Sequence, residues 1–160
     1  KNPLLKDYER GRIATEKFFQ HAKETFQFDG SVKELELIWS EIFTPIKEHL
    51  LLVQNLFQHY PLALISNTNE SHMRHLSRQH DFFTFFREKI YSHEVGHAKP
   101  APEIYETALK RMKTTPETSL FIDDLEENVL APAQMGWQTI HLKPGDSLQL
   151  ALQHYELQGI

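Results

Sequence analysis

Three groups of polar residues have the types and the order that a site for a phosphoryl group and its metal requires. Ser66 and Asn67 place a hydroxyl and an amide directly after a short apolar run. Lys99 supplies a cation after the next apolar run, and the adjacent carboxylates Asp123 and Asp124 follow a third. Two adjacent acids repel each other, and they become favourable when Mg²⁺ lies between them. The three groups together indicate phosphoryl chemistry assisted by a metal.

Each group also has an interpretation that needs no ligand. The polar run at 66–69 could simply cap a helix, and an exposed lysine is usually only solvated. The acidic pair could form a solvated turn at a helix N-terminus, where negative charge is favourable. The order of the three groups at three successive strand ends favours the site over these separate explanations.

A second metal pattern overlaps the lysine. His93, Glu94 and His97 spell H-E-x-x-H, which on a helix presents two histidines to zinc and a glutamate as general base. The context disfavours a helix here, because a glycine lies inside the segment and a proline follows it closely. Later glutamates could supply a third ligand, so a zinc hydrolase stays as a remote hypothesis. We interpret the match as accidental.

Short apolar runs alternate with amphipathic segments through the last two thirds of the chain. The expected strands are 62–65, 90–91, 120–122 and 139–142, and the expected helices are 47–59, 71–80, 103–112, 128–135 and a last one near the C-terminus. Buried strands separated by helices are typical of a parallel sheet covered on both faces. Ligands bind such sheets beyond the carboxyl ends of the strands, which is where the three polar groups fall.

The first third of the sequence has only helical patterns. Thr15 is expected to cap one helix, and Ser31 begins a capping box for a second. A proline then interrupts the pattern, because the residue before a proline avoids the helical region. We therefore expect a helical unit at 1–44 and an α/β domain at 45–160.

Composition excludes several functional classes. The 160 residues are 40% hydrophobic and 24% charged, with a net charge of -5 and no cysteine. Disulfides and cysteine-ligated zinc are therefore excluded, and an acidic chain without a basic cluster is not expected to bind nucleic acid. No apolar run approaches the roughly 20 residues that span a bilayer, so we expect no membrane insertion and a cytoplasmic location. The sequence indicates no oligomeric state.

The same polar groups carry a family resemblance. ALISNTN, HAKPAPEIY and LFIDDLEEN resemble the second, third and fourth motifs of the haloacid dehalogenase-like (HAD) superfamily. YERGRIATEKFF and the helix after it are similar to the helical cap of its phosphatase branch, which closes over the active site and selects the substrate. The resemblance covers nearly the whole chain. It implies a Rossmann-like α/β core with a small helical cap.

The resemblance implies a role for each matched residue. Ser66, helped by Asn67, would hydrogen-bond the phosphoryl oxygens, and Lys99 would neutralise charge and orient the nucleophile. Asp124 would be a direct Mg²⁺ ligand, with Asp123 beside it. The paired acids favour a metal-dependent phosphatase over the metal-free dehalogenases, although Asn128 stands where some relatives carry a further acid.

The nucleophile of the family has no match in this sequence. Relatives attack phosphorus with an aspartate of a D-x-D pattern on an N-terminal strand, and the nearest imitation here is Gln27 with Asp29. An amide cannot form an aspartyl-phosphate, and we interpret this segment as the turn between two cap helices. We therefore expect the first core strand to be absent from these 160 residues. Its absence would leave unpaired strand edges between the strands that end near Ser66 and Asp123, and the chain inactive as it stands.

Two functional hypotheses follow. The leading one is an Mg²⁺-dependent phosphomonoesterase that acts on a small phosphorylated metabolite. The alternative is a non-catalytic HAD-like protein that binds phosphate and metal, or that binds a partner through its exposed sheet.

Overall fold

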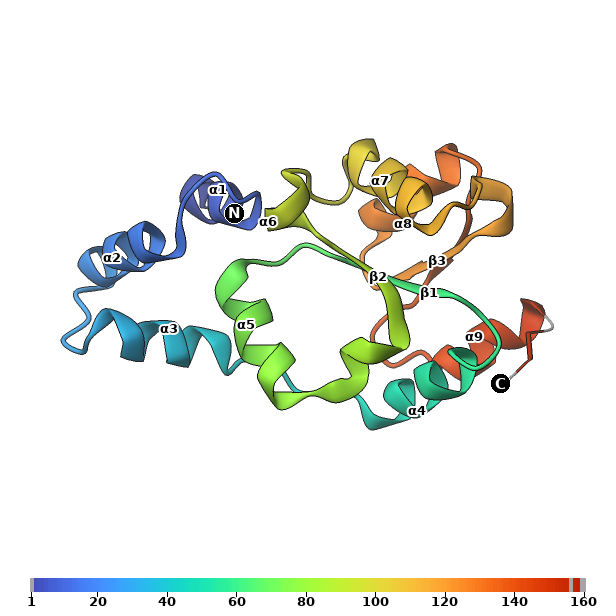
Figure 1. Cartoon of the computed structure of the whole chain (residues 1–160), viewed down its shortest axis with the longest axis horizontal. Coiled ribbons are helices and arrows are strands. Elements are labelled where there is room, and N and C mark those ends of the chain that lie inside the picture. The colour runs from blue at the N-terminus through green and yellow to red at the C-terminus, as the bar shows by residue number, and fades with distance from the viewer. Residues whose placement is uncertain (1, 156, 159–160) are drawn as a thin grey trace.

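The computed structural model describes residues 2–155 and 157–158, and it divides into a helical end and an α/β end (Figure 1). The helical end consists of α1 (Pro3–Glu9), α2 (Thr15–Phe26) and α3 (Val32–Ser40). The α/β end contains α4 (Lys47–Leu56), β1 (Leu62–Ser66), α5 (Glu70–Gln79), β2 (Phe86–Tyr91), α6 (Ser92–Val95), α7 (Pro102–Met112), β3 (Leu120–Asp123), α8 (Glu126–Gln134), β4 (Gln138–His141) and α9 (Leu148–Leu152). Short 3₁₀ turns occupy Asp81–Phe85, Pro116–Thr118 and Gln153–Tyr155.

The helix starts show which local signals of the sequence were decisive. The capping box at α3 is confirmed, because the Ser31 hydroxyl accepts from the Glu34 N–H and the Glu34 carboxylate accepts from the Ser31 N–H. The expected cap at Thr15 is wrong. Ala14 occupies the N-cap of α2 without a side-chain bond, and the Thr15 hydroxyl donates instead to the carboxylate of Glu70 on α5. A contact with another element has replaced a local one.

The strands form two separate parallel pairs. β1 pairs with β2 so that Ser66 lies opposite Tyr91, and β3 pairs with β4 so that Asp123 lies opposite His141. Among the described residues, β1 and β3 have one hydrogen-bonded neighbour each, and the two pairs are not joined into one sheet. The expected strands are thus all present, and the separation into two pairs agrees with the expected unpaired edges between the strands that end near Ser66 and Asp123.

Alternating side chains of both pairs enter two shared hydrophobic clusters. On one face, Ile65 and Phe121 pack with Ile104 and Tyr105 of α7 and Val129 of α8. On the other face, β1, β3 and β4 pack against α4 and α9, through Leu62, Leu120, Ile122, Ile140, Leu52, Leu56, Leu148 and Leu152. Because β1 and β3 contribute to both clusters, helices cover both faces, as Figure 1 shows for α7 and α8 above and α4 and α9 below. The predicted α/β class is confirmed.

The helical end has a hydrophobic cluster of its own. Tyr8, Phe18 and Phe19 are buried together, and the ring centroids of Tyr8 and Phe18 lie 4.2 Å apart in a stacked arrangement. Trp39 of α3 meets the rings of Phe18 and Phe19 edge-on. The chain is non-helical at 41–46, between α3 and α4. The division into domains at 44/45 stays a prediction.

None of the described helices combines the length and the apolar character that crossing a bilayer requires.

Candidate active site

The side chain of Lys99 lies between the carboxyl ends of β1 and β3. Its Nζ donates to the carbonyl of Ile65 on β1 at 3.0 Å and to Asp123 Oδ2 on β3 at 2.6 Å. It also lies 5.6 Å from the centroid of the Phe121 ring. The ion pair is sheltered, with only 10% of the Lys99 side chain and 6% of the Asp123 side chain exposed. The two strands that share no backbone hydrogen bond are therefore joined by a buried ammonium group.

Asn67 fixes the backbone of Lys99. The Lys99 N–H donates to Asn67 Oδ1 at 2.7 Å, and Asn67 Nδ2 donates to the Lys99 carbonyl at 2.9 Å. Both polar atoms of the amide are engaged in this way, so Asn67 positions the lysine with its side chain. Ser66, the last residue of β1, follows Ile65, whose carbonyl binds the Lys99 ammonium. The hydroxyl and the cation expected at the site are thus brought to the same strand end.

Asp123 uses both carboxylate oxygens within the protein. While Oδ2 accepts from Lys99, Oδ1 accepts from the Leu125 N–H at 2.9 Å and from Asn128 Nδ2 at 2.8 Å. Burial opposes ionisation of Asp123, but the charge and hydrogen bond of Lys99 and the bonds from Asn128 and Leu125 outweigh it and hold its pKa below the usual value. Asp123 is therefore a carboxylate that holds Lys99 in place.

Asp124 and Asn128 keep oxygen atoms without a hydrogen-bond partner. The Asp124 residue is exposed, and its carbonyl interacts with His141 Nε2 at 3.1 Å, while no bond involves its carboxylate within the described part of the chain. Asn128 is buried, and its Oδ1 has no hydrogen-bond partner among the residues that the structure describes. Its own carbonyl accepts from the Tyr105 hydroxyl, whose pKa is raised by burial and by the charges of Asp123 and Glu127.

The Asp124 carboxylate and Asn128 Oδ1 could supply some, but not all, of the ligands of a hard cation. Mg²⁺ takes a few carboxylate or amide oxygens and completes its octahedron with waters and substrate phosphate. Among the described residues, no group of three or more His, Cys, Asp or Glu side chains could hold a metal by itself. An exposed carboxylate at Asp124 and the free Oδ1 of Asn128 match an ion that relies on ligands from outside the protein.

One supporting contact was missed by the sequence reasoning. The hydroxyl of Ser92, which is fully buried at the start of α6, accepts from the Thr68 N–H and donates to the Thr68 carbonyl, both at 2.9 Å. This pair of bonds fixes the loop after β1 to the end of β2. Serine directly after a strand carries no signal that distinguishes such a role from ordinary capping.

The H-E-x-x-H segment does not form the helix that a zinc site needs. α6 ends at Val95, and Gly96 follows with φ +78. His93 stacks on Tyr91 with ring centroids 5.8 Å apart, whereas His97 Nδ1 lies 3.8 Å from Glu103 Oε2. Burial lowers the pKa of His93, against the opposing influence of Glu94. These placements agree with the interpretation of the match as accidental.

The Gln27 and Asp29 pair lies away from the site. Gln27 is the C-cap of α2 in the left-handed region, with φ +51, and Asp29 is exposed in the turn that leads to α3. Figure 1 shows this turn at the end of the molecule opposite to β3 and α7. The prediction of a turn between two helices is confirmed.

Comparisons with known sequences give matches over most of the chain. The family model for haloacid dehalogenase-like hydrolases matches residues 6–136. D-ribitol-5-phosphate phosphatase of Bacteroides thetaiotaomicron is 25% identical over 149 residues, which are 89% of this chain and 72% of that protein.

Solved structures show the same fold. A HAD family enzyme from Bacteroides thetaiotaomicron, in complex with magnesium and inorganic phosphate, aligns with a TM-score of 0.82 at 25% identity and covers 92% of this chain and 78% of its own. A HAD-like family hydrolase from Porphyromonas gingivalis aligns with a TM-score of 0.83 at 23% identity, over 97% of this chain and 79% of its own. Because this identity is below 25%, the match with the Porphyromonas gingivalis hydrolase is evidence for the fold alone.

Proposed function

Because this chain belongs to the haloacid dehalogenase-like hydrolase family, we propose that its site serves an Mg²⁺-dependent phosphomonoesterase acting on a small phosphorylated metabolite. The observation that carries the proposal is the position of Lys99, whose ammonium is held between the ends of β1 and β3 by Ile65 and Asp123. A fixed, water-shielded cation at this edge meets a dianionic phosphoryl group without reorganisation. The hydroxyl of Ser66 at the end of β1 is the neighbouring hydrogen-bond donor.

In our proposal, some of the surrounding residues position Lys99 and others bind the metal. In place of the predicted contact with the phosphoryl group, the side chain of Asn67 fixes the backbone of Lys99 with both of its polar atoms. Asp123, predicted to lie beside the Mg²⁺ ligand Asp124, orients the Lys99 ammonium with one carboxylate oxygen. Asp124 supplies the carboxylate that would hold Mg²⁺, and Asn128 offers its unpartnered Oδ1. When bound, the cation would neutralise charge on the phosphoryl oxygens and hold the phosphate in place.

We propose that the attacking carboxylate lies on a further strand between β1 and β3. The open edges of these two strands, which belong to two separate pairs, support this placement. The position of Asp29 in the α2–α3 turn supports it as well, because Figure 1 shows this turn at the opposite end of the molecule from β3, whose Asp123 binds Lys99. A strand in this place would hydrogen-bond to both edges and bring an aspartate to the same end as Ser66 and Lys99.

For the substrate we propose a phosphorylated polyol or sugar. The similarity to D-ribitol-5-phosphate phosphatase supports this class. An acidic chain, with a net charge of -5, gives no long-range attraction for a large polyanion, so a small monoester that is bound by local contacts fits better.

The experiment compares the 160-residue chain with a fusion that adds an N-terminal segment carrying the family's D-x-D strand. Phosphate release from D-ribitol 5-phosphate and related monoesters is measured with and without Mg²⁺. We expect turnover by the fusion only, lost when the strand aspartates become asparagine and reduced at least tenfold by Asp124→Asn. A folded fusion without turnover on any monoester would contradict the function, and equal turnover by the unfused chain would contradict the placement of the nucleophile.

A further inference from the structure

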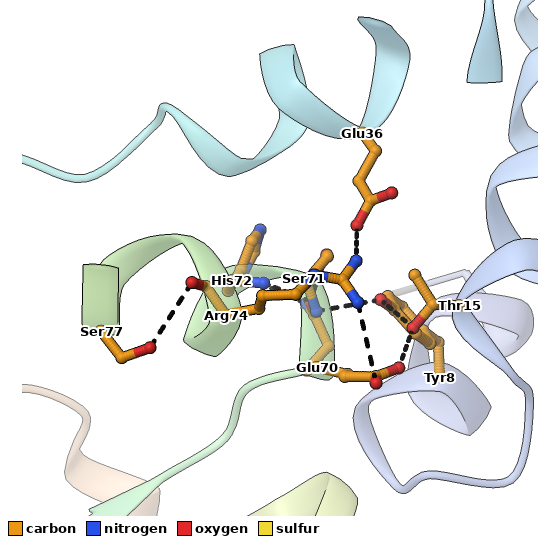
Figure 2. A network of polar contacts seen from close by, with 9 residues as sticks. Tyr8, Thr15, Glu36, Glu70, Ser71, His72, Arg74 and Ser77 are labelled. Atoms are coloured by element: carbon orange, nitrogen blue, oxygen red, sulfur yellow. Dashed lines mark hydrogen bonds and ion pairs between the residues drawn. The ribbon is translucent and has the colours of Figure 1, made fainter. Parts of the chain in front are cut away.

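The junction between α3 and α5 is built around one buried histidine. His72 lies in the first turn of α5 and is only 7% exposed. Its ring stacks on Trp39 of α3, with centroids 5.9 Å apart, and meets the Phe43 ring edge-on at 4.8 Å. Figure 2 shows it among the polar contacts that join α5 to the N-terminal helices. His72 therefore connects the helical end to the α/β end.

Both ring nitrogens of His72 have partners, and these partners suit a single protonation state. Nε2 lies 3.2 Å from the carbonyl of Trp39, which can only accept, so Nε2 carries the proton. Nδ1 lies 3.1 Å from Asn69 Nδ2, which donates. The orientation of the Asn69 amide is fixed, because its Oδ1 already accepts from the Ser71 hydroxyl and from the His72 N–H. A neutral imidazole satisfies every bond at the junction.

A second proton on His72 would have no acceptor. Nδ1–H would face the Asn69 amide group, and turning that amide would remove the oxygen that caps α5. The charged or titratable groups on the surrounding elements are Lys33, Glu34 and Glu36 of α3, Glu41 at its C-cap, and Glu70, Arg74, His75 and Arg78 of α5. Among the described residues, none of these carboxylates hydrogen-bonds to the ring. Glu36 and Glu70 are instead engaged by Arg74.

We propose that His72 is a pH-sensitive positioning residue, which in its neutral form holds α3 against the turn that follows β1 and on protonation releases Trp39 from α5. The turn in question ends at Asn69, three residues after Ser66, so the same histidine connects α3 to the loop of the candidate site. The inference concerns this junction and holds independently of the proposed phosphatase activity.

The direction of the pH effect follows from burial. Desolvation lowers the pKa of His72, with a smaller opposing influence from the bond to the Trp39 carbonyl. A histidine with a depressed pKa in the folded state contributes stability above its ordinary value of 6.5 and loses that contribution as pH falls through the folded value. The junction is therefore intact at neutral pH and opens in mild acid.

Other contacts make this release local. The Ser71 N–H donates to the Tyr8 hydroxyl at 3.3 Å, and the Thr15 hydroxyl donates to Glu70 (Figure 2). These bonds join α1 and α2 to α5 without using the imidazole. Protonation of His72 is thus expected to hydrate Trp39 while α1 and α2 stay attached.

Trp39 itself reports the event. In a Trp137→Phe variant it is the single tryptophan, and its emission maximum is recorded between pH 7.5 and 5 together with far-UV circular dichroism. We expect a red shift of Trp39 emission with a midpoint below 6.5 and no loss of helix content. The shift is expected to vanish in His72→Gln. It is expected to persist in His75→Gln, the control on the same helix, with a higher midpoint, because the charge of His75 lowers the pKa of His72.

Two outcomes would overturn the proposal. One is an emission maximum that stays constant over this range in the protein with His72 intact. The other is an equal shift in His72→Gln, which would assign the event to another group. If Trp137→Phe does not fold, the difference between the wild-type and His72→Gln titrations isolates the same signal, and the ring shifts of His72 by NMR give its protonation directly.

Discussion

Replacing Lys99 by methionine tests how the site is held together. The substitution keeps most of the side-chain volume and leaves the Asp123 carboxylate, 6% exposed, without its cation. Breaking a buried ion pair by removing one partner costs roughly 3–5 kcal/mol. Asp123 retains the bonds from Leu125 and Asn128, which places the expected loss near the low end, at about 3 kcal/mol.

Urea unfolding at pH 7, followed by circular dichroism, measures this loss. With an m-value of about 1.5 kcal/mol per molar, the midpoint should fall by about 2 M. Asp123→Asn in the same background removes the orphaned charge, so the double variant should recover a large part of the loss. Lys143→Met, at an exposed lysine, is the matched control and should change stability by no more than about 0.5 kcal/mol.

The effect of Lys99→Met should also depend on pH. The pKa of Asp123 is depressed in the fold, so the pair stabilises the protein above the ordinary carboxylate range and stops doing so as pH falls through the folded value. The difference between wild type and Lys99→Met should therefore be greatest at neutral pH and above, and it should narrow as pH falls and the orphaned Asp123 carboxylate of the variant takes up a proton. A loss no larger than that of Lys143→Met at pH 7 would refute the reasoning.

Three further substitutions test the contacts of α6 and of the loop after β1. Gly11→Ala should destabilise the protein by roughly 2–4 kcal/mol, because φ is +67 and the new Cβ would lie 2.1 Å from the His93 carbonyl oxygen. Gly96→Ala is the control, since Gly96 has a similar φ of +78 but open space around it, and it should cost only about 1 kcal/mol. Similar losses for both would show that the contact of the α1–α2 turn with α6 is not tight. Ser92→Ala should cost about 1–3 kcal/mol, since it leaves the N–H and carbonyl of Thr68 unpaired in a buried place, and unchanged urea midpoints would contradict those bonds.

Patterns with a short range in sequence predicted most of the fold. Apolar runs of strand length gave β1, β3 and β4 to within one residue, because buried strands need continuous apolar residues on both faces. β2 was predicted at 90–91, but it begins at Phe86. Its first half was missed because Arg87, Glu88 and Lys89 are charged and do not form an apolar run. Helix α1 was not predicted, although Asn2 caps it and a proline occupies its first position; the packing of Tyr8 on Phe18 then fixes its place.

The candidate site was predictable as a set of residue types but not as a network. The order of Ser66, Lys99 and the acidic pair placed them at strand ends, and Lys99 with Asp123 does lie between β1 and β3. The engagement of both polar atoms of Asn67 by the Lys99 backbone depends on where the loop after α6 returns, which no local pattern encodes. The sequence of two adjacent aspartates likewise could not show that Asp123, and not Asp124, binds Lys99, because this also depends on where the loop after α6 returns.

The central claim is that this edge binds a phosphoryl group with Mg²⁺, and calorimetric titration of inorganic phosphate into the 160-residue chain tests it most directly. The account predicts phosphate binding that strengthens when Mg²⁺ is present, that weakens at least tenfold in Ser66→Ala, and that loses its Mg²⁺ dependence in Asp124→Asn. Both substitutions are at the strand ends and leave the Lys99–Asp123 pair in place, so the fold should persist. Absence of phosphate binding by a folded chain, or binding that neither substitution changes, would contradict the account.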